Sequence, residues 1–323
     1  MTEPLVFKND RFVPASQASL AIYDAGIVLG VTVTDMTRTF RHQLFRASDH
    51  VDRFFRSLKY VRLDVGFSKA EVMALGAQLI EHNAKLIGPD DELGLIHFAT
   101  PGEYRTYAGS AGGTANSKPT FVMHTFPLPW EVWANKIERG AHVVTPSTRH
   151  IPPQCVDPKI KYRSRMHYYL ADKEATLADP NAIALLLDLD GNVTETSGAN
   201  FLIVENGCII SPTLRNTLPG VSRQMVIELA AELGIPFIER DIQVFNVINA
   251  DEAFLATTPV CLMPVTKING VMIADGRPGL IFQRLHDLWS EKVGLDIHQQ
   301  LMAGAEGRFS FRHHQCGAHT PRC

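Results

Sequence analysis

The stretch Gly191-Asn-Val-Thr-Glu-Thr-Ser-Gly-Ala-Asn-Phe-Leu-Ile-Val204 decides how the second half of the chain is interpreted. It follows the apolar run 182–187, which is typical of a fully buried strand, and its own last four residues begin a second strand. One carboxylate, Glu195, lies between the two strands in a loop of Thr, Ser, Gly and Ala. Such small neighbours let a flat ligand approach the backbone closely, whereas a plain β-hairpin with an exposed glutamate fits the same residues. The other motifs of the chain decide between these interpretations.

The composition is that of an ordinary globular protein of 323 residues, enough for one large domain or two medium ones. A formal net charge of -3 gives no sign of a nucleic-acid or membrane-surface partner. No apolar run reaches the length of a membrane span, and residues 1–5 lack the features of a signal peptide, so we expect a cytoplasmic protein. The five cysteines are odd in number and scattered, which favours free thiols over a disulfide framework.

In the first half of the chain we expect a hairpin around Asn9-Asp10 and then strands at residues 18–23, 32–40, 93–100 and 119–126. Two helices are expected, at residues 47–58 with Ser48 or Asp49 as cap, and at residues 69–86, where Ser68 and Glu71 form a capping box. The Gly- and Ser-rich segment 101–117 is typical of a long loop that is mobile or functional. Residues 127–129 are expected to be a linker between domains.

The second half is expected to alternate strands and helices. Strands are predicted at residues 141–145, 182–187, 201–204, 208–210, 238–242 and 253–257, and a hairpin with an Asn269-Gly270 turn is predicted at residues 265–273. Helices are predicted at residues 218–234 and 279–293, and the last part of the segment 161–177 is also predicted to be helical. No internal repeat is present.

The opening of the helix at 218–234 has the features of a phosphate site. Gly220-Val-Ser-Arg223 offers free backbone N–H groups, a positive dipole end and the Ser222 hydroxyl. Thr257 and Thr258, after an apolar strand, would add donors. Arg53 would add a charge-assisted contact, although taken alone it fits a solvated arginine on a helix face.

Lys161 is a candidate for Schiff-base chemistry. Lys159 and Lys161 alternate with Ile160, so the two lysines are expected on one face of an extended segment. Arg163 and Arg165 would lower its pKa or bind a substrate carboxylate, while the same basic cluster also fits a surface patch.

Several motifs occur together in one order. They are His50-Val-Asp-Arg53; Ile160-Lys161 with Ala171–Ala175; Gly191–Glu195 with Gly198–Phe201; Leu218–Arg223; and Ala250–Phe254 followed by Thr257-Thr258 and Met263–Val265. With these motifs, the chain from about residue 6 to residue 288 resembles the class IV (fold-type IV) pyridoxal-phosphate enzymes. This family includes branched-chain and D-amino-acid aminotransferases, (R)-selective amine transaminases and aminodeoxychorismate lyase.

The resemblance implies a two-domain α/β fold. A smaller N-terminal α/β domain would span residues 1–126, and a larger C-terminal α/β pseudo-barrel domain, at 127–300, would carry most contacts to the cofactor. Residues 301–323 would be an extension of unknown role. The cofactor pyridoxal 5′-phosphate (PLP) would lie between the domains, and the family is dimeric, so we expect a homodimer.

The resemblance also assigns roles to residues. Lys161 is similar to the Schiff-base lysine that carries the proton, and Glu195 to the partner of the pyridine nitrogen, which keeps the ring an electron sink. The residues that resemble the phosphate and cofactor contacts of the family are Arg53, Val221, Ser222, Thr257 and Thr258, with Gly198 and Ala199 where a loop approaches cofactor and substrate.

The reaction implied is ping-pong transamination, from an amino acid or amine to a 2-oxo acid or ketone, with no metal. Two alternatives stay open: a PLP-dependent lyase of the aminodeoxychorismate lyase type, and a non-catalytic binding protein that kept the fold. The presence of both Lys161 and Glu195 argues against the second alternative, because a degenerate pocket needs no Schiff-base lysine.

Departures from the family pattern leave the substrate open. Met166 stands where some members have Tyr, Leu29-Gly30 lacks an aromatic residue, and residues 100–102 lack the carboxylate-binding arginine of D-amino-acid aminotransferases. The candidates to replace that arginine are Arg38, Arg105, Arg163 and Arg165. The tail at 309–323 lies beyond the resemblance, and its histidines and cysteines fit no standard zinc spacing.

Overall fold

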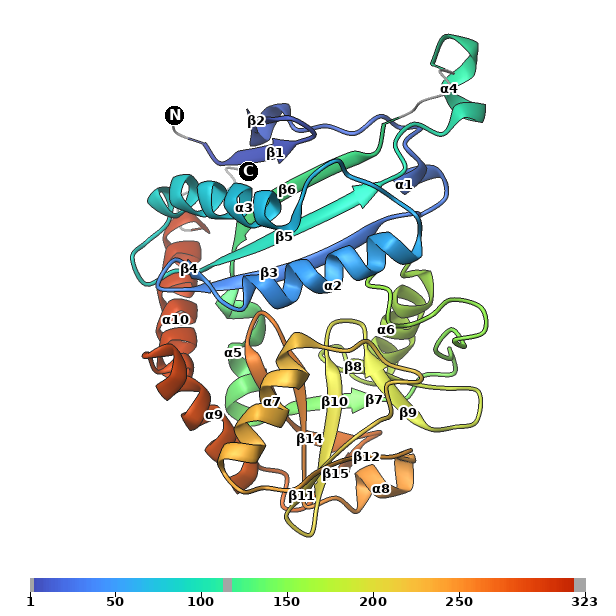
Figure 1. Cartoon of the computed structure of the whole chain (residues 1–323). Helices are drawn as coiled ribbons and strands as arrows, with labels where there is room; N and C mark the ends of the chain where they lie inside the picture. Colours follow the sequence, from blue (N-terminus) through green and yellow to red (C-terminus); the bar gives the residue numbers. More distant parts are fainter. Residues whose placement is uncertain (1–2, 113–117, 317–323) are drawn as a thin grey trace, which may run out of the picture. The chain divides into compact units, whose positions relative to one another are not determined.

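The computed structural model describes the backbone of residues 3–112 and 118–316, and the side chains of these residues except 110–112 and 307–316. The chain divides into two compact units (Figure 1). Unit 1 comprises Met1–Leu128, Ile151–Tyr169 and Leu214–Val221, and unit 2 comprises Pro129–His150, Leu170–Thr213 and Ser222–Cys323. Each unit contains one sheet, and both sheets are accompanied by helices, which confirms the predicted α/β fold.

Unit 1 is built on a six-stranded antiparallel sheet of order β2-β1-β6-β5-β3-β4. Its strands are β1 (Leu5–Lys8), β2 (Arg11–Pro14), β3 (Val33–Phe40), β4 (Gln43–Leu44), β5 (Leu93–Thr100) and β6 (Thr120–Pro127). Its helical segments are η1 (Ala15–Gln17), α1 (Ala25–Val28), α2 (Ala47–Tyr60), α3 (Lys69–Asn83), η2 (Ala84–Leu86) and α4 (Arg105–Gly112).

Helices α2 and α3 lie across one face of this sheet (Figure 1). Val51, Phe54 and Leu58 fall on one side of α2 at helical spacing and are buried, because they pack into the same core as Val33 and Phe121 of the strands. Burial of this apolar stripe is what fixes α2 on β3.

Unit 2 is built on a nine-stranded mixed sheet of order β12-β11-β10-β13-β14-β7-β8-β9, with β15 beside β14. The strands are β7 (Ala141–Val144), β8 (Ile183–Leu187), β9 (Val193–Thr196), β10 (Asn200–Glu205), β11 (Cys208–Ser211), β12 (Phe237–Glu239), β13 (Glu252–Thr257), β14 (Cys261–Ile268) and β15 (Val271–Met272). β9 also pairs with β10, where Glu195 lies opposite Asn200. This pairing returns the sheet upon itself, which gives the barrel-like sheet that the resemblance implied.

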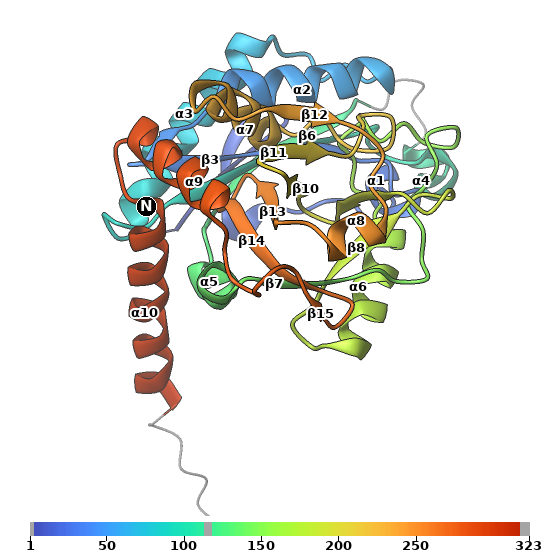
Figure 2. The same cartoon turned by 90° about the horizontal axis from the view of Figure 1, so that it is seen from below.

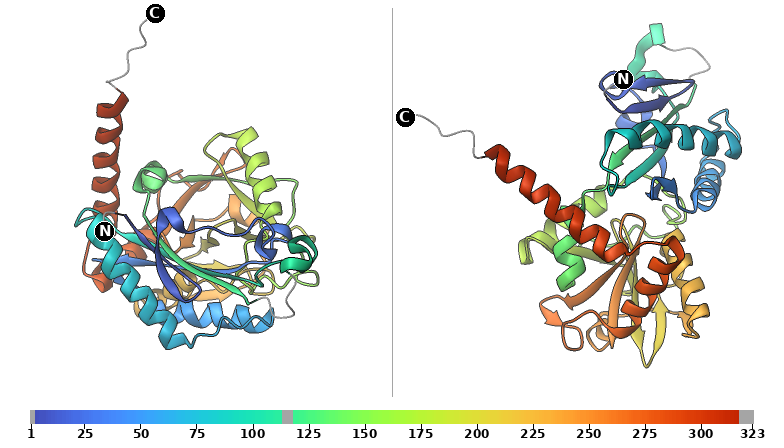
Figure 3. Two further views of the ribbon diagram at one scale, coloured as in Figure 1. Left: turned by 90° about the horizontal axis from the view of Figure 1, so that it is seen from above. Right: turned by 90° about the vertical axis from the view of Figure 1, so that its left-hand side faces the viewer.

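The helices of unit 2 are α5 (Trp130–Arg139), α8 (Val244–Ile248), α9 (Leu280–Val293) and α10 (Ile297–Cys316). Helices α6 (Met166–Ala178) and α7 (Val221–Glu232) begin in unit 1 and continue in unit 2. Helices α5 and α9 both pack on β14 (Figure 2). Helix α10 packs along α5 (Figure 3). The two helices approach closely at Gly304, where an added Cβ would lie 2.2 Å from Cδ1 of the buried Trp130.

Several elements differ from their predictions. Residues 18–23 form no strand, and Ile22 is exposed. Helix α2 is preceded by Arg46 in the left-handed conformation, not capped by Ser48 or Asp49. The predicted loop 101–117 contains α4, and its residues 113–117 lie outside the described part of the chain. Helix α10 begins at Ile297, and residues 317–323 of the tail lie outside the described part of the chain.

Other predictions are confirmed. β1 and β2 form the hairpin around Asn9-Asp10, and Ser68 and Glu71 form the capping box of α3. Cys155 and Cys208 are free thiols, while the side chains of Cys316 and Cys323 lie outside the described residues. Within the described residues, none of the helices has the length and hydropathy that a membrane span requires.

Candidate active site

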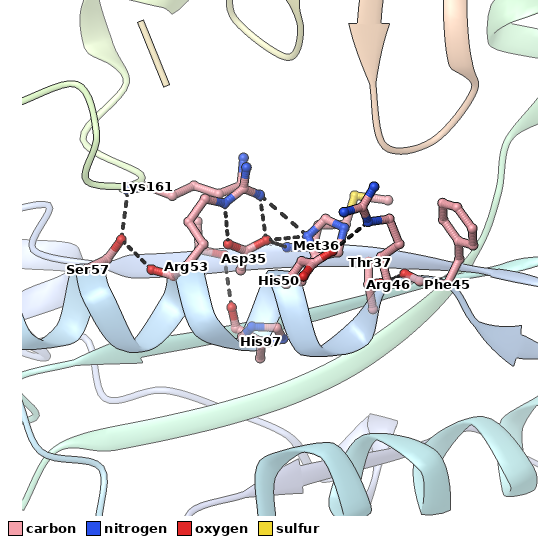
Figure 4. Close-up of polar contacts among 12 residues, drawn as sticks. Asp35, Met36, Thr37, Phe45, Arg46, His50, Arg53, Ser57, His97 and Lys161 are labelled. Atoms are coloured by element: carbon pink, nitrogen blue, oxygen red, sulfur yellow. Dashed lines mark hydrogen bonds and ion pairs between the residues drawn. The ribbon is translucent and has the colours of Figure 1, made fainter. Parts of the chain in front are cut away.

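A buried ion pair joins α2 to β3 in unit 1 (Figure 4). His50 and Arg53 are three residues apart, so both side chains leave α2 on the side that faces β3. Arg53 donates from Nε to Asp35 Oδ2 and from Nη2 to Asp35 Oδ1, each at 2.8 Å, in the parallel two-bond geometry that arginine forms with carboxylates. His50 Nδ1 lies 2.9 Å from Asp35 Oδ1. The exposed fractions of Asp35, His50 and Arg53 are only 0, 2 and 3%.

The charges of this cluster follow from its contacts. Burial alone would raise the pKa of Asp35, but the charge and hydrogen bonds of Arg53 and the hydrogen bond of His50 hold the pKa well below its usual value. Asp35 is therefore ionised. Burial lowers the pKa of His50, and the charges of Arg53 and Lys161 act in the same direction against the raising effect of Asp35. A neutral His50 beside an ionised Asp35 must donate its Nδ1–H to the carboxylate.

A second histidine, His97 on β5, lies opposite Asp35 in the strand register. Its ring contacts that of Phe54 edge to face, with centroids 4.6 Å apart. Burial is the main cause that lowers the pKa of His97, to about 4. The cluster therefore holds one cation, one anion and two neutral imidazoles at neutral pH.

The free edge of Arg53 meets the segment that leads into α7. Nη1 donates to the carbonyl oxygen of Pro219 at 3.1 Å. Two residues later α7 begins at Val221, and Ser222 follows in its first turn; both are buried. The first N–H groups of a helix have no partner within the helix and carry the positive end of its dipole. Arg53 is thus hydrogen-bonded to Pro219, two residues before the start of the helix whose opening is predicted as a phosphate site.

Lys161 is attached to the same two elements. Its backbone N–H donates to Ser57 Oγ at 3.2 Å, and its carbonyl oxygen accepts from the N–H of Thr34 at 2.9 Å. Ser57 lies one turn after Arg53 on α2, and its hydroxyl donates to the Arg53 carbonyl oxygen (Figure 4). The backbone at Lys161 is therefore fixed to α2 and β3, while its side chain is only partly buried.

Lys159 differs from its prediction. Residues 157–160 form a turn, closed by the N–H of Ile160 on the carbonyl oxygen of Asp157, so the two lysines do not share one extended segment. Lys159 is exposed and lies 3.7 Å from the Asp157 carboxylate. Of the two lysines, only Lys161 is anchored to the buried cluster.

Glu195 lies in unit 2, in strand β9 and not in a loop as predicted. It is 8% exposed, which also excludes the exposed-hairpin interpretation. Asn200, its cross-strand partner, donates from Nδ2 to Glu195 Oε2 at 3.0 Å, and His150 Nε2 lies 3.8 Å from Oε1. These neighbours fix the carboxylate in one orientation.

The loop after Glu195 is held to the end of β13. Thr196 and Ala199 close the loop, since the Thr196 N–H donates to the Ala199 carbonyl oxygen at 3.0 Å. Thr257 Oγ1 donates to the carbonyl oxygen of Gly198 at 2.8 Å, and Thr258 follows it, partly buried. The predicted residues of unit 2 thus form a second group, made of the Glu195 strand, its loop and the Thr257-Thr258 turn.

The four candidate arginines for a substrate carboxylate all lie in unit 1. Arg38 is buried, with its guanidinium carbon 3.9 Å from the ring centroid of Phe40. Arg163 lies over the ring of Phe98 at 4.8 Å, and Arg165 donates from Nε to the Tyr162 carbonyl oxygen. Arg105, at the start of α4, is exposed.

Sequence reasoning missed Asp35, His97, His150 and Asn200. The sequence does contain a signal for Asp35 as a paired residue. Asp35 lies in an alternating strand on the same face as Val33 and Thr37, and a carboxylate on a buried face rarely lacks a partner. The partner of a buried carboxylate cannot be read from the strand itself. The Asn200 contact depends on the β9–β10 pairing, which only the fold provides.

Comparison with known proteins identifies a family whose sequence pattern this chain matches. The family model for class IV aminotransferases matches residues 32–268, which include all the predicted site residues. A putative branched-chain-amino-acid aminotransferase of Methanocaldococcus jannaschii is 27% identical over 299 residues, which cover 91% of this chain and 99% of the relative. A D-alanine aminotransferase of Listeria innocua is 28% identical, covering 89% and 96%.

Solved structures with the same fold support the match. A branched-chain amino acid aminotransferase of Escherichia coli superposes with a TM-score of 0.82 at 22% identity, covering 90% of this chain and 94% of that one. The T.th. branched-chain amino acid aminotransferase, solved with pyridoxamine 5′-phosphate, gives a TM-score of 0.80 at 25% identity with the same coverage. Both the sequence family and the fold agree with the resemblance inferred from the motifs. The chain belongs to the class IV aminotransferase family.

Proposed function

We propose that this protein is a PLP-dependent aminotransferase that moves an amino group from an amino acid or amine to a 2-oxo acid or ketone by a ping-pong mechanism. The observation that carries the proposal is the position of Arg53, a buried arginine held beside the N-terminus of α7. Membership of the family and the pyridoxamine 5′-phosphate complex of the T.th. enzyme support the same cofactor.

The residues present fit the phosphate of this cofactor. A guanidinium has five N–H donors, and the contacts to Asp35 and Pro219 use three of them; Nη2 also lies 3.5 Å from His50 Nδ1, so Nη1 keeps a second N–H for a ligand. The backbone N–H groups of Val221 and Ser222 and the Ser222 hydroxyl would add donors at the helix start. Thr258 would complete this set from the turn after β13.

The residues also fit the ring and its chemistry. Glu195 is buried and held by Asn200, so it would keep a ring nitrogen protonated. When bound, PLP supplies an aldehyde that takes up the amino group and a ring that accepts the electron pair of the substrate's α-carbon. Lys161 would anchor the cofactor through Nζ and then carry the proton to and from the α-carbon.

The loop at Gly198-Ala199 would form a wall of the substrate site. Gly198 is exposed, and a Cβ added there would meet no described atom within 4 Å, so the backbone is open to a flat ligand. The bond from Thr257 fixes the loop in this position. The branched-chain and D-alanine aminotransferase relatives suggest an α-amino acid as donor, of either hand.

Absorption spectroscopy of the purified protein tests the function. We expect a visible band of bound cofactor that disappears when the right amino donor is added and returns when a 2-oxo acid or ketone follows. A panel of L- and D-amino acids and simple amines would identify the donor. A band that persists with every donor, together with elimination from an amino substrate, would favour the lyase alternative. No cofactor band after incubation with PLP would contradict the proposal.

Two further expectations from the family need their own measurement. We expect a homodimer, which light scattering after size-exclusion chromatography would detect as twice the mass of 35.8 kDa. We also propose small-molecule substrates in the cytoplasm, with no nucleic-acid or membrane partner.

A further inference from the structure

Arg53 owes its position to a residue that would not touch the cofactor. An arginine side chain has several rotatable bonds, and fixing it costs conformational entropy. Here the guanidinium is held at two edges, by the Asp35 carboxylate at 2.8 Å on one side and by the Pro219 carbonyl oxygen at 3.1 Å on the other. The plane of the group is therefore fixed before a ligand arrives.

Asp35 is fixed in its turn. It lies within β3, fully buried, and His50 donates to the same oxygen that receives Nη2 of Arg53. The Met36 N–H donates to Oδ1 at 2.7 Å as well. The carboxylate thus has contacts from the strand, the helix and side chains. Because it is fixed to β3, it holds the guanidinium of Arg53 in a fixed position relative to that strand.

The pair has no net charge, since one cation faces one anion and the two histidines beside it are neutral. A neutral pair attracts a phosphate less by overall charge than a lone arginine would. Its contribution must come from N–H donors that already point in the right direction.

We propose that Asp35 is a positioning residue for the cofactor phosphate, acting through Arg53, with His50 holding the Asp35 carboxylate in place. The inference rests on the proposed function, because it requires that the ligand at α7 is the phosphate of PLP. It predicts that loss of Asp35 weakens the binding of phosphate and leaves the binding of the rest of the cofactor unchanged.

The test compares PLP with pyridoxal, which lacks the phosphate, as ligands of the full-length apo-protein. Dissociation constants are measured by absorbance for the wild type, Asp35→Asn, Arg53→Gln and the double variant. We expect Asp35→Asn to weaken PLP binding by about tenfold to a hundredfold, as for loss of a charged hydrogen bond, and to change pyridoxal binding by less than about twofold. In the Arg53→Gln background the same change should add less than about twofold.

Asp49→Asn is the matched control. Asp49 lies on the same helix, but it pairs with Arg46 at a partly exposed site, so both affinities should stay at the wild-type value. If Asp35→Asn does not fold, a pair of changes at His50 tests the same chain of contacts. His50→Asn retains a donor near the Nδ1 position and should keep the preference for PLP over pyridoxal, while His50→Leu removes the donor and should reduce it.

Three outcomes would overturn the inference. Equal weakening of PLP and pyridoxal would assign Asp35 a purely structural role. An undiminished effect of Asp35→Asn in the Arg53→Gln background would mean that Asp35 does not act through Arg53. Unchanged PLP binding in a folded Asp35→Asn protein would mean that Asp35 does not contribute to cofactor binding. If the wild type binds neither ligand, the proposed function itself fails, and this result differs from all three.

Discussion

The guanidinium of Arg53 and the carboxylate of Asp35 form two parallel hydrogen bonds of 2.8 Å at a site where both side chains are almost fully buried. A buried ion pair gains Coulomb energy but loses the hydration of both charges. Such a pair therefore fixes the positions of its two side chains, but it adds little to the net free energy of unfolding.

Removing one partner of this pair should be costly. Arg53→Met leaves the Asp35 charge buried without its cation, so we expect the free energy of unfolding to fall by about 3–5 kcal/mol. Asp35→Leu combined with Arg53→Met should cost less than the sum of the two single changes, because no unpaired charge remains. Urea unfolding of the apo-proteins measures both values. Additive costs would mean that the two charges do not depend on each other.

The stability of the protein should fall in mild acid. An unfolded histidine titrates near 6.5, whereas the pKa of folded His97 is about 4. Between these values the unfolded chain binds more protons, so the free energy of unfolding decreases as the pH drops, by at most about 1.4 kcal/mol per pH unit for one group. His50 acts in the same direction, because its pKa is also lowered.

Asp35 extends this acid sensitivity to lower pH. Its folded pKa lies below the unfolded value of 3.8, so its stabilising contribution is present above 3.8 and is lost as the pH falls through the folded pKa.

Urea unfolding between pH 7.5 and pH 4.5 measures the contribution of the histidines, because Asp35 stays ionised over this range. His97→Phe keeps an aromatic contact with Phe54 and should show a shallower decrease than the wild type. The same slope in both proteins would exclude His97 as the cause.

Glu195 should matter for turnover more than for folding. Glu195→Gln keeps the shape and an acceptor for Asn200 but removes the charge, so we expect kcat to fall by about 10²-fold or more while the cofactor stays bound. Asp190→Asn, in the exposed turn before β9, is the control and should retain wild-type kcat. Equal activity of the two variants would separate Glu195 from the chemistry.

The contact between α10 and α5 should not tolerate a larger residue at Gly304. A Cβ there would lie 2.2 Å from the indole of Trp130, which is 1% exposed and cannot easily move. We expect Gly304→Ala to destabilise the protein by about 1–3 kcal/mol in thermal or urea unfolding, as other overpacked sites do. Gly88→Ala is the control, since its Cβ would make only an ordinary contact, 3.5 Å from Asp91 Oδ2.

Local patterns predicted those elements whose signals are local. The Ser68–Glu71 capping box and the Asn9-Asp10 hairpin depend on neighbouring residues, and strand β5 has the predicted bounds because its apolar run ends at turn residues on both sides. By contrast, residues 18–23 have strand composition but find no partner strand, so the backbone stays irregular. Propensity alone cannot report the absence of a partner.

The candidate site shows the same division. The ordered motifs, each weak alone, predict Lys161, Glu195 and Arg53 as site residues. They do not predict the residues that hold these side chains, because Asp35 lies 18 residues from Arg53 and Asn200 contacts Glu195 only through strand pairing. Glu195 was expected in a loop because its neighbours are small, yet Thr194 and Thr196 are β-branched residues that suit a strand buried on both faces.

Reductive trapping of the cofactor tests the central claim most directly. The protein is incubated with PLP, reduced with borohydride, digested and mapped by mass spectrometry. We predict that the phosphopyridoxyl group is found on Lys161, and that Lys161→Ala loses both the label and the visible band while Lys159→Ala keeps them. A label on Lys159 or on another lysine, or a Lys161→Ala protein that retains band and activity, would contradict the account.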